Sequence, residues 1–172
     1  MRARVDGAAL RQARVARGLT QADVARGVHV AGGERVSAWE REAGFPDVRL
    51  VPLLAAVLDV DPLSLLRLPD EGVDLRGLRW AAGLTAEEVA SRLHVSRSTF
   101  LGWESGARRL PGDEALLETL ARALNTSPEV VLRVQDRRQR LGRGRWCQRS
   151  WKVSSAAVVC WSRATRRGDD SA

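Results

Sequence analysis

LTAEEVASRLHVSRSTFLGWE, residues 84–104, predicts two short helices joined by a tight turn. Thr85 is a preferred N-cap residue, and the glutamate three positions later completes a capping-box pattern. Ser96 is placed to cap the second helix. Phe100 and Trp103 lie three positions apart and therefore share one face of that helix. This stretch decides the fold, because it predicts a helix-turn-helix whose second helix is buried along one side only.

The opposite side of the second helix carries Arg97, Ser98, Leu101 and Gly102. A short helix with Arg and Ser exposed near its start suits the major groove of DNA. The stretch resembles the helix-turn-helix of the Cro/cI-like (XRE) family of bacterial and phage regulators. This resemblance implies a lambda-repressor-like domain of five helices that binds double-stranded DNA through the second helix of the motif, the recognition helix.

The chain contains this pattern twice. Residues 10–40 and 75–104 align at an offset of 65 residues as far as the turn, after which Trp39 and Trp103 pair at an offset of 64. The first copy therefore carries one extra residue in its turn. An internal repeat of this length indicates two tandem domains. The identical pairs at the larger offset include Leu10/Leu75, Arg14/Arg79, Gly18/Gly83, Leu19/Leu84, Thr20/Thr85, Val24/Val89, Ala25/Ala90, His29/His94 and Val30/Val95.

The predicted fold class is all-α, with two tandem five-helix, lambda-repressor-like domains. We place the first repeat at residues 7–67 and the second repeat at residues 74–134, joined by a polar linker at residues 68–73. Residues 135–172 form a basic tail that we expect to be disordered. Two interpretations of the tail stay open: an arm that adds non-specific affinity for phosphates, or an end without a role.

Composition limits the class of protein. At 172 residues and 44% apolar, the chain has room for two small cores. The net charge of +7 comes from the tail: residues 133–172 hold eleven basic and three acidic residues, which leaves seventeen basic and eighteen acidic for residues 1–132.

There is no long apolar run or signal-peptide core, and the two cysteines suit neither a metal site nor a disulfide framework. We therefore expect a cytoplasmic bacterial protein, associated with the nucleoid when bound to DNA, without a membrane or metal partner.

Three details of the first repeat can be checked directly. Asp6 is expected to cap a helix that runs through Arg17. Pro52 falls about one turn into the apolar stretch at residues 48–58, so the fourth helix either kinks there or begins late. A fifth helix is expected at Leu63–Leu66, after an Asp-Pro pair.

The resemblance assigns DNA-facing positions in both repeats. In this family a glutamine at Gln21 holds a phosphate, and the loop after the recognition helix lies along the DNA backbone. The first repeat departs from the pattern, because Gly32 and Gly33 weaken a helix start and Glu34 repels phosphates unless it accepts from a cytosine amino group. We therefore expect the second repeat to be the base reader. The candidate DNA-binding residues are Gln21, Glu34, Arg35, Thr85, Arg97, Ser98, Thr99, Gly102, Arg108 and Arg109.

Two arginine–glutamate pairs have two interpretations. Arg14 with Glu40, and Arg79 with Glu104, match positions where the family carries a largely buried ion pair between its first and third helices. The arginines could instead contact DNA, but we favour the internal pair. His29 and His94 end the second helix of each unit, where we expect a turn role and no metal ligation.

Catalytic chemistry has no support in the sequence. It contains no nucleophile–base pair, clustered carboxylate dyad, phosphate-binding loop or metal-ligand spacing, so we expect no enzyme activity and no cofactor. The predicted function is sequence-specific binding of double-stranded DNA by a transcriptional regulator, with homodimerisation left open. The alternative is a protein-interaction module, as in an antitoxin or an adaptor, which the unusual Gly32-Gly33-Glu34 segment favours.

Overall fold

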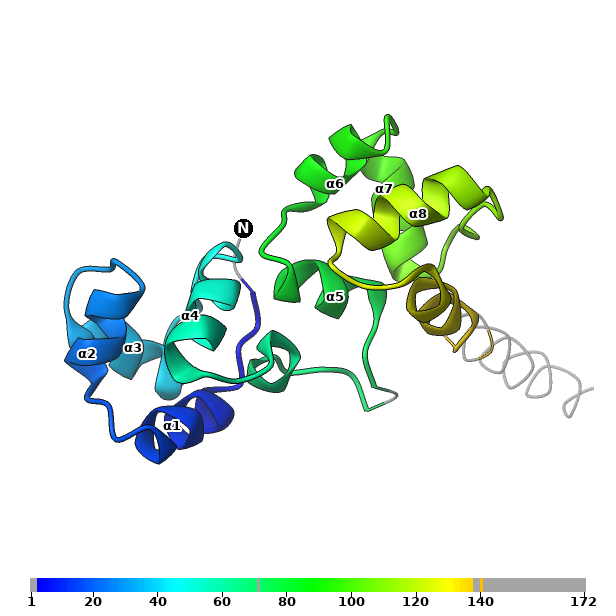
Figure 1. Cartoon of the computed structure of the whole chain (residues 1–172). Coiled ribbons are helices and arrows are strands. Elements are labelled where there is room, and N and C mark those ends of the chain that lie inside the picture. Colours follow the sequence, from blue (N-terminus) through cyan, green and yellow to red (C-terminus); the bar gives the residue numbers. More distant parts are fainter. Residues whose placement is uncertain (1–2, 71, 138–139, 141–172) are drawn as a thin grey trace, which may run out of the picture. The chain divides into compact units, whose positions relative to one another are not determined.

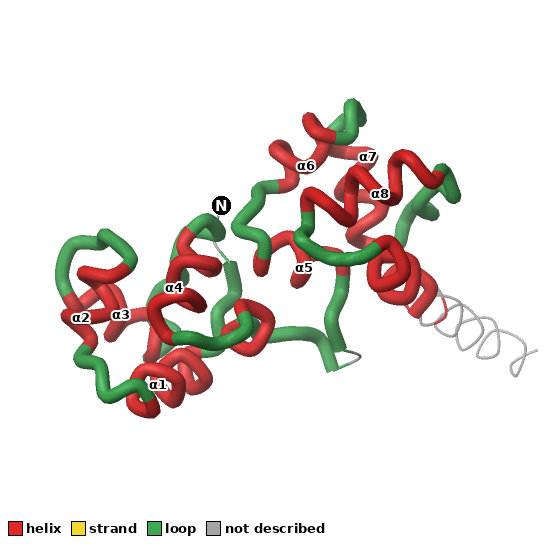
Figure 2. The backbone as a smooth tube through the Cα atoms, viewed as in Figure 1, coloured by secondary structure: helices red, strands yellow, loops and turns green. Residues whose placement is uncertain are grey.

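The described residues of the chain fold into helices and loops (Figures 1 and 2). The structure, a computed structural model, describes residues 3–70, 72–137 and 140. Within these residues it contains no β-strand, which confirms the all-α prediction. In chain order the elements are α1 (Gly7–Ala16), α2 (Gln21–Gly27), α3 (Gly33–Glu40), α4 (Leu50–Leu58), the 3-10 helix η1 (Pro62–Leu65), α5 (Leu75–Ala81), α6 (Ala86–Arg92), α7 (Arg97–Ser105) and α8 (Glu114–Ala123).

A last helix occupies residues 128–137. The expected start of a disordered tail at residue 135 is therefore wrong, because Gln135 is helical and only 4% exposed. Val131 and Val134, which precede it at helical spacing, are buried and continue the apolar stripe that defines the helix. Apart from Arg140, the rest of the predicted tail lies outside the described residues.

Side-chain caps set where most helices begin. The Asp6 carboxylate accepts hydrogen bonds from the backbone N–H groups of Ala8 and Ala9, at 2.9 and 3.1 Å. Thr20 and Thr85 each form a complete capping box at the start of α2 and α6. These contacts satisfy N–H groups that have no partner within the helix, which is why short helices begin sharply at these positions. The predicted caps at Asp6 and Thr85 are confirmed.

The fourth helix begins late, which was one of the two expectations for it. Its first residue is Leu50, so Pro52 occupies the third position, where a helical N–H has no internal acceptor. The preceding turn is held by Asp47, whose carboxylate accepts from the Arg49 backbone N–H at 3.1 Å. Proline is therefore accommodated without a kink.

The fifth helix expected at Leu63–Leu66 is a short 3-10 helix, η1. Asp61 caps it by accepting from the Leu63 backbone N–H at 2.8 Å. Leu66 leaves the turn in an extended conformation and forms an isolated antiparallel bridge with Val5. The pairing with the N-terminal segment ends the helix after one turn, and this long-range contact has no trace in the local sequence.

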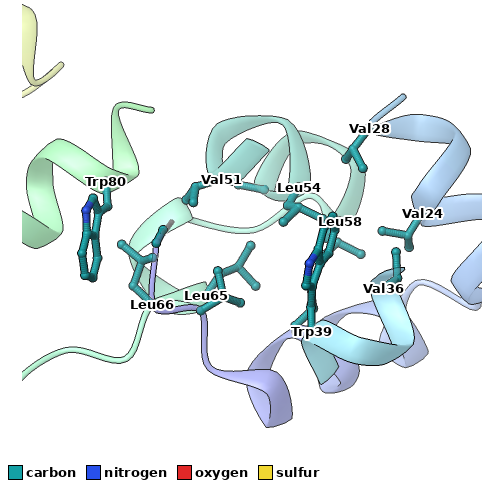
Figure 3. Close-up of a cluster of buried hydrophobic side chains, with 14 of the residues drawn as sticks. Val24, Val28, Val36, Trp39, Val51, Leu54, Leu58, Leu65, Leu66 and Trp80 are labelled. Carbon is teal, nitrogen blue, oxygen red and sulfur yellow. The ribbon is translucent and has the colours of Figure 1, made fainter. Parts of the chain in front are cut away.

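The first hydrophobic core lies between α1–α4 and η1 (Figure 3). Trp39 from α3 and Leu54 from α4 are among its largest members. Ala3 and Val5, which precede the first helix, are also buried in it. The core of the first repeat thus includes residues upstream of position 7.

The second core is built from α5 to α8 and the helix at residues 128–137. Phe100 and Trp103 on α7 are 0% and 4% exposed, and their rings meet edge to face with centroids 6.3 Å apart. The members of this core are Leu75, Leu78, Ala86, Val89, Ala90, Leu93, Phe100, Trp103, Leu110, Leu117, Leu120, Ala121, Leu124, Val131 and Val134.

The two cores lie in one compact unit, Met1–Gln135. Trp80 belongs to α5 but packs with the first core, beside Val51 and Leu66 (Figure 3). Arg49, just before α4, donates a hydrogen bond at 2.7 Å to Glu88 on α6. These contacts attach the start of the second repeat to the α4–η1 side of the first.

Replacing Trp80 tests this attachment. Trp80→Ala should lower the free energy of unfolding by about 3–5 kcal/mol, because it leaves a cavity beside the first core. Trp80→Phe should cost much less, since it keeps an aromatic ring and removes an indole N–H that has no hydrogen-bond partner among the described residues. Urea unfolding followed by circular dichroism measures both values. Equal losses for the two variants would contradict this account of the contact.

Candidate nucleic-acid interface

The helix-turn-helix of the second repeat consists of α6, a turn at His94-Val95-Ser96, and α7. His94 has a left-handed backbone conformation, with φ of 53°, and Val95 donates its backbone N–H to the Ala90 carbonyl at 3.0 Å. His29 ends α2 in the same way, with φ of 57°. Histidine is among the residues that tolerate this conformation. The turn role expected for both histidines is confirmed.

Three hydroxyl groups gather at the start of α7. The Ser96 Oγ accepts from the Thr99 backbone N–H at 3.0 Å and lies 2.8 Å from both the Ser98 Oγ and the Thr99 Oγ1. Ser98 is exposed and Thr99 is half-buried. The start of α7 is therefore a polar surface whose backbone donors are partly satisfied by its own side chains.

Arg97 projects from the same end of α7. Its side chain is 61% exposed, and its Nε lies 3.9 Å from the nearest carboxylate oxygen of Glu87 on α6. An ion pair this long and this exposed contributes little, so the guanidinium is available to another partner. The opposite side of the helix is buried through Phe100 and Trp103. The outward orientation expected for Arg97 and Ser98 is confirmed, whereas Leu101, expected on the same side, is partly buried against the second core.

The loop after α7 brings two more arginines to the surface. Arg108 and Arg109 are both exposed, and neither forms an ion pair among the described residues. Arg108 donates its backbone N–H to the Gly102 carbonyl at 3.0 Å, which returns the loop to the helix. Arg97, Ser98, Gly102 and Arg108 are thus all carried by α7 or tied to it.

Thr85 occupies a different environment. Its hydroxyl accepts from the Glu88 backbone N–H at 3.2 Å and lies 2.9 Å from the Glu88 carboxylate. The carboxylate also accepts from the Thr85 backbone N–H at 2.7 Å. Thr85, one of the candidate DNA-binding residues, is therefore engaged within its own capping box.

Arg79 and Glu104 join α5 to α7 inside the second core. Both side chains are 0% exposed, and the Arg79 Nε donates to a Glu104 carboxylate oxygen at 2.6 Å. The Arg79 Nη1 donates to the Leu84 carbonyl at 2.8 Å. Both groups are thus removed from solvent and cannot contact DNA without a rearrangement of the core.

Arg14 and Glu40 repeat this arrangement in the first core. The Arg14 Nε donates to a Glu40 oxygen at 2.6 Å, and its Nη1 donates to the Leu19 carbonyl at 2.9 Å. Gln21 adds a third contact, because its Nε2 donates to Glu40 at 2.8 Å. Burial alone would raise the pKa of Glu40, but the hydrogen bonds from Arg14 and Gln21 outweigh it and lower the pKa. Gln21, predicted to hold a phosphate, is here part of this internal network.

The start of α3 differs from the start of α7. Gly32 serves as N-cap with φ of 72° and offers no side-chain cap. Gly33 packs against the start of α2, where a Cβ atom would lie 3.1 Å from the Ala22 backbone nitrogen. The Glu34 carboxylate folds back beside Gly32, 2.0 Å from where a Cβ on that residue would lie. The sequence predicted only a stability cost for these glycines and missed the close packing that requires them.

The two helix starts therefore differ in charge, because α3 carries the Glu34 carboxylate next to Arg35, whereas α7 carries Arg97 without an acidic neighbour on its first turn. Glu34 and Arg35 are both exposed on the first turn of α3, and the carboxylate lies at the helix N-terminus, where the helix dipole favours it. At the counterpart positions α7 carries Ser98 and Thr99, after Arg97.

The link between Arg49 and Glu88 is a site that the sequence did not predict. Glu88 was expected only to cap α6, and Arg49 is thirty-nine positions away in the chain. Hydrogen bonds from the Thr85 backbone and from Arg49 lower the pKa of Glu88 to about 2. No local pattern could have indicated this pair, since it depends on the contact between the two repeats.

Comparison with known proteins identifies part of the chain. Residues 72–134 match a family model described as a helix-turn-helix domain. The match covers the second repeat from α5 to the last helix. Neither a curated protein nor a solved structure matches the chain. In the described part of the chain every helix is too short or too polar to cross a bilayer, and no group of three or more His, Cys, Asp or Glu side chains is placed to bind a metal ion.

Breaking the buried pair should cost more than removing it. Arg79→Ala leaves the Glu104 charge buried without its main partner and should lower the free energy of unfolding by about 3–5 kcal/mol. The double variant Arg79→Met, Glu104→Leu should lose less, because no buried charge remains. Denaturant unfolding of both variants measures the difference. A double variant less stable than Arg79→Ala would contradict the assignment.

The Glu88 carboxylate should make stability depend on acid pH. Because its pKa is lowered from 4.5 to about 2 in the folded state, its contribution is complete above about pH 4.5 and is lost as the pH falls towards 2. The stability difference between the wild type and Glu88→Gln should therefore be constant near neutral pH and shrink across this range. Glu87→Gln, which alters an exposed neighbour, is the control. A difference that stays constant down to pH 2 would exclude the lowered pKa.

Proposed function

We propose that this protein is a sequence-specific, double-stranded DNA-binding regulator of the Cro/cI-like type, built from tandem helix-turn-helix domains at residues 7–67 and 74–134. One observation carries the proposal. The second repeat, which matches the helix-turn-helix family model, fixes α7 so that Arg97 and Ser98 face outward. α7 would enter the major groove, and the protein would act by occupying a promoter.

The chemistry of the exposed groups suits DNA. An arginine guanidinium can donate two hydrogen bonds to the O6 and N7 of guanine, and a serine hydroxyl can donate or accept at a base edge. Arg97 and Ser98 would supply these contacts, while Arg108 and Arg109 would bind phosphates and set the orientation of α7. Thr99 would act beside them, since its hydroxyl lies within the same cluster.

The second repeat is the proposed base reader. The Glu34 carboxylate at the start of α3 would repel DNA phosphates. Arg97 at the start of α7 would attract them. Gln21 is engaged by Glu40, so it would have to leave an internal hydrogen bond to hold a phosphate. Arg35 is exposed and could still add affinity. We therefore assign a supporting role to the first repeat.

A second function is favoured by that same feature. A helix start that carries an exposed carboxylate suits a protein partner better than a DNA backbone, so the first repeat could serve as an interaction module, as in an antitoxin or an adaptor. This alternative predicts that the binding of duplex DNA is weak and independent of α7.

Titration of a duplex selected by the full chain from random DNA tests the proposal. Fluorescence polarisation at about 50 and 200 mM salt should show saturable binding that weakens as salt rises. Arg97→Ala should weaken specific binding by roughly 5- to 150-fold, which corresponds to about 1–3 kcal/mol for one bidentate base contact. Its thermal unfolding should match that of the wild type, because the side chain is exposed.

Arg35→Ala is the matched control, because it removes the same charge from the first turn of α3. It should reduce affinity less than Arg97→Ala does. Equal affinity of Arg97→Ala and the wild type would reject the role of Arg97. The absence of saturable binding to any selected duplex would reject the regulator and favour the interaction module.

A further inference from the structure

The side chain of Arg108 lies directly against α7 at Gly102. A Cβ atom at position 102 would be 3.0, 3.1 and 3.4 Å from the Cδ, Cγ and Cβ atoms of Arg108. The first two distances are tighter than most contacts of real Cβ atoms, so a side chain at position 102 would push the arginine stem away by a few tenths of an ångström. The absence of a side chain on Gly102 therefore lets the arginine lie this close to the helix.

The backbone of Arg108 is fixed on two sides. Its N–H donates to the Gly102 carbonyl at 3.0 Å, and its own carbonyl accepts from the Gln135 Nε2 at 3.4 Å. Gln135 is a buried polar side chain, only 4% exposed, on the helix at residues 128–137. Gly106, with φ of 75°, reverses the chain between α7 and this point. The loop thus holds Arg108 in one place while its side chain stays exposed.

The first repeat supplies an internal comparison. There the backbone N–H of Ala43, five residues after Ala38, donates to the Ala38 carbonyl at 2.9 Å, whereas Arg108 lies six residues after the Gly102 carbonyl to which it donates. The loop returns to the same position of the helix in both repeats, since Ala38 precedes Trp39 as Gly102 precedes Trp103. Position 38 carries a methyl group where position 102 carries none, and the residue that returns to it comes one place earlier in the loop than Arg108 does.

We propose that Gly102 is a positioning residue that allows the Arg108 side chain to lie against α7. In this position the Arg108 guanidinium binds a DNA phosphate beside the bases that Arg97 and Ser98 face. This inference rests on the proposed function. The energetic argument is preorganisation: a long arginine held along the helix loses less conformational freedom on binding than one projecting from a free loop. Glycine is otherwise unfavourable within a helix, so position 102 gives up helix stability for this contact.

Gly102→Ala therefore has an unusual expected result. The added methyl should displace the Arg108 stem and weaken DNA binding, while the melting temperature stays the same or rises, because alanine favours the helix. The decisive readout is the dependence of affinity on salt. Loss of one phosphate contact should reduce the slope of log K against log salt concentration by about 0.9. A merely structural role for Gly102 would not change this slope.

A double-mutant cycle on the full chain, titrated with the selected duplex over a range of salt concentrations, tests the proposal. Gly102→Ala and Arg108→Ala should reduce the slope equally, and combining them should add nothing further. Arg108→Lys, which keeps the charge, should retain most of the slope. Ala38→Gly, the opposite exchange in the first repeat, should leave it unchanged.

The other outcomes overturn the proposal. If Gly102→Ala keeps the wild-type slope of log K against log salt concentration, the contact between Arg108 and Gly102 is not needed for phosphate binding. If Gly102→Ala weakens binding further in the Arg108→Ala background, the glycine acts by direct contact with DNA. The wild-type titration separates these results from failure of the proposed function, since a wild type without saturable binding rejects both at once.

Discussion

The rest of the structure depends on one constraint, namely which side of α7 faces the second core. Phe100 and Trp103 are buried in the second core. Glu104, on the same side of α7, forms an ion pair with Arg79, and both side chains are inaccessible to solvent. Because an α-helix turns once every 3.6 residues, these anchors also fix the direction of every other position on the helix. The apolar contacts supply most of the stabilisation, whereas the ion pair selects one arrangement, since a shifted helix would leave a buried charge unpaired. The polar start of α7 is exposed as a consequence of what its other side buries.

The two repeats share the same internal ion pair but differ in their exposed residues. Each pairs an arginine of its first helix with a glutamate of its third and donates from the same guanidinium to a backbone carbonyl five residues on. Differences at the surface include the starts of α3 and α7 and the loops that follow these helices. Packing therefore limits the interior, while the exposed positions are free to differ in charge. The two repeats thus have similar ion pairs in their interiors and different charges at the starts of α3 and α7.

Local chemistry explains which features the sequence predicted. Capping residues, the late start of α4 at Pro52 and the apolar spacing on α7 depend on neighbours within one helical turn, and each is found in the structure. What escaped prediction depends on residues far apart in the chain. Periodicity carries no information on such contacts, and a glycine required for close packing looks the same in sequence as one that only weakens a helix. The features missed were the 3-10 geometry of the expected fifth helix, the packing of Ala3 and Val5, the insertion of Trp80 into the first core, the pair of Arg49 with Glu88, the close approach at Gly33 and the contact of the Arg108 side chain with Gly102.

The entry of α7 into the major groove of a duplex can be seen in a structure of the full chain bound to its selected duplex. We expect α7 to lie in the groove with Arg97 and Ser98 towards the base edges and the Arg108 guanidinium at a phosphate. A complex in which α7 faces away from the duplex, or in which another segment covers its polar start, would rule out this mode of binding.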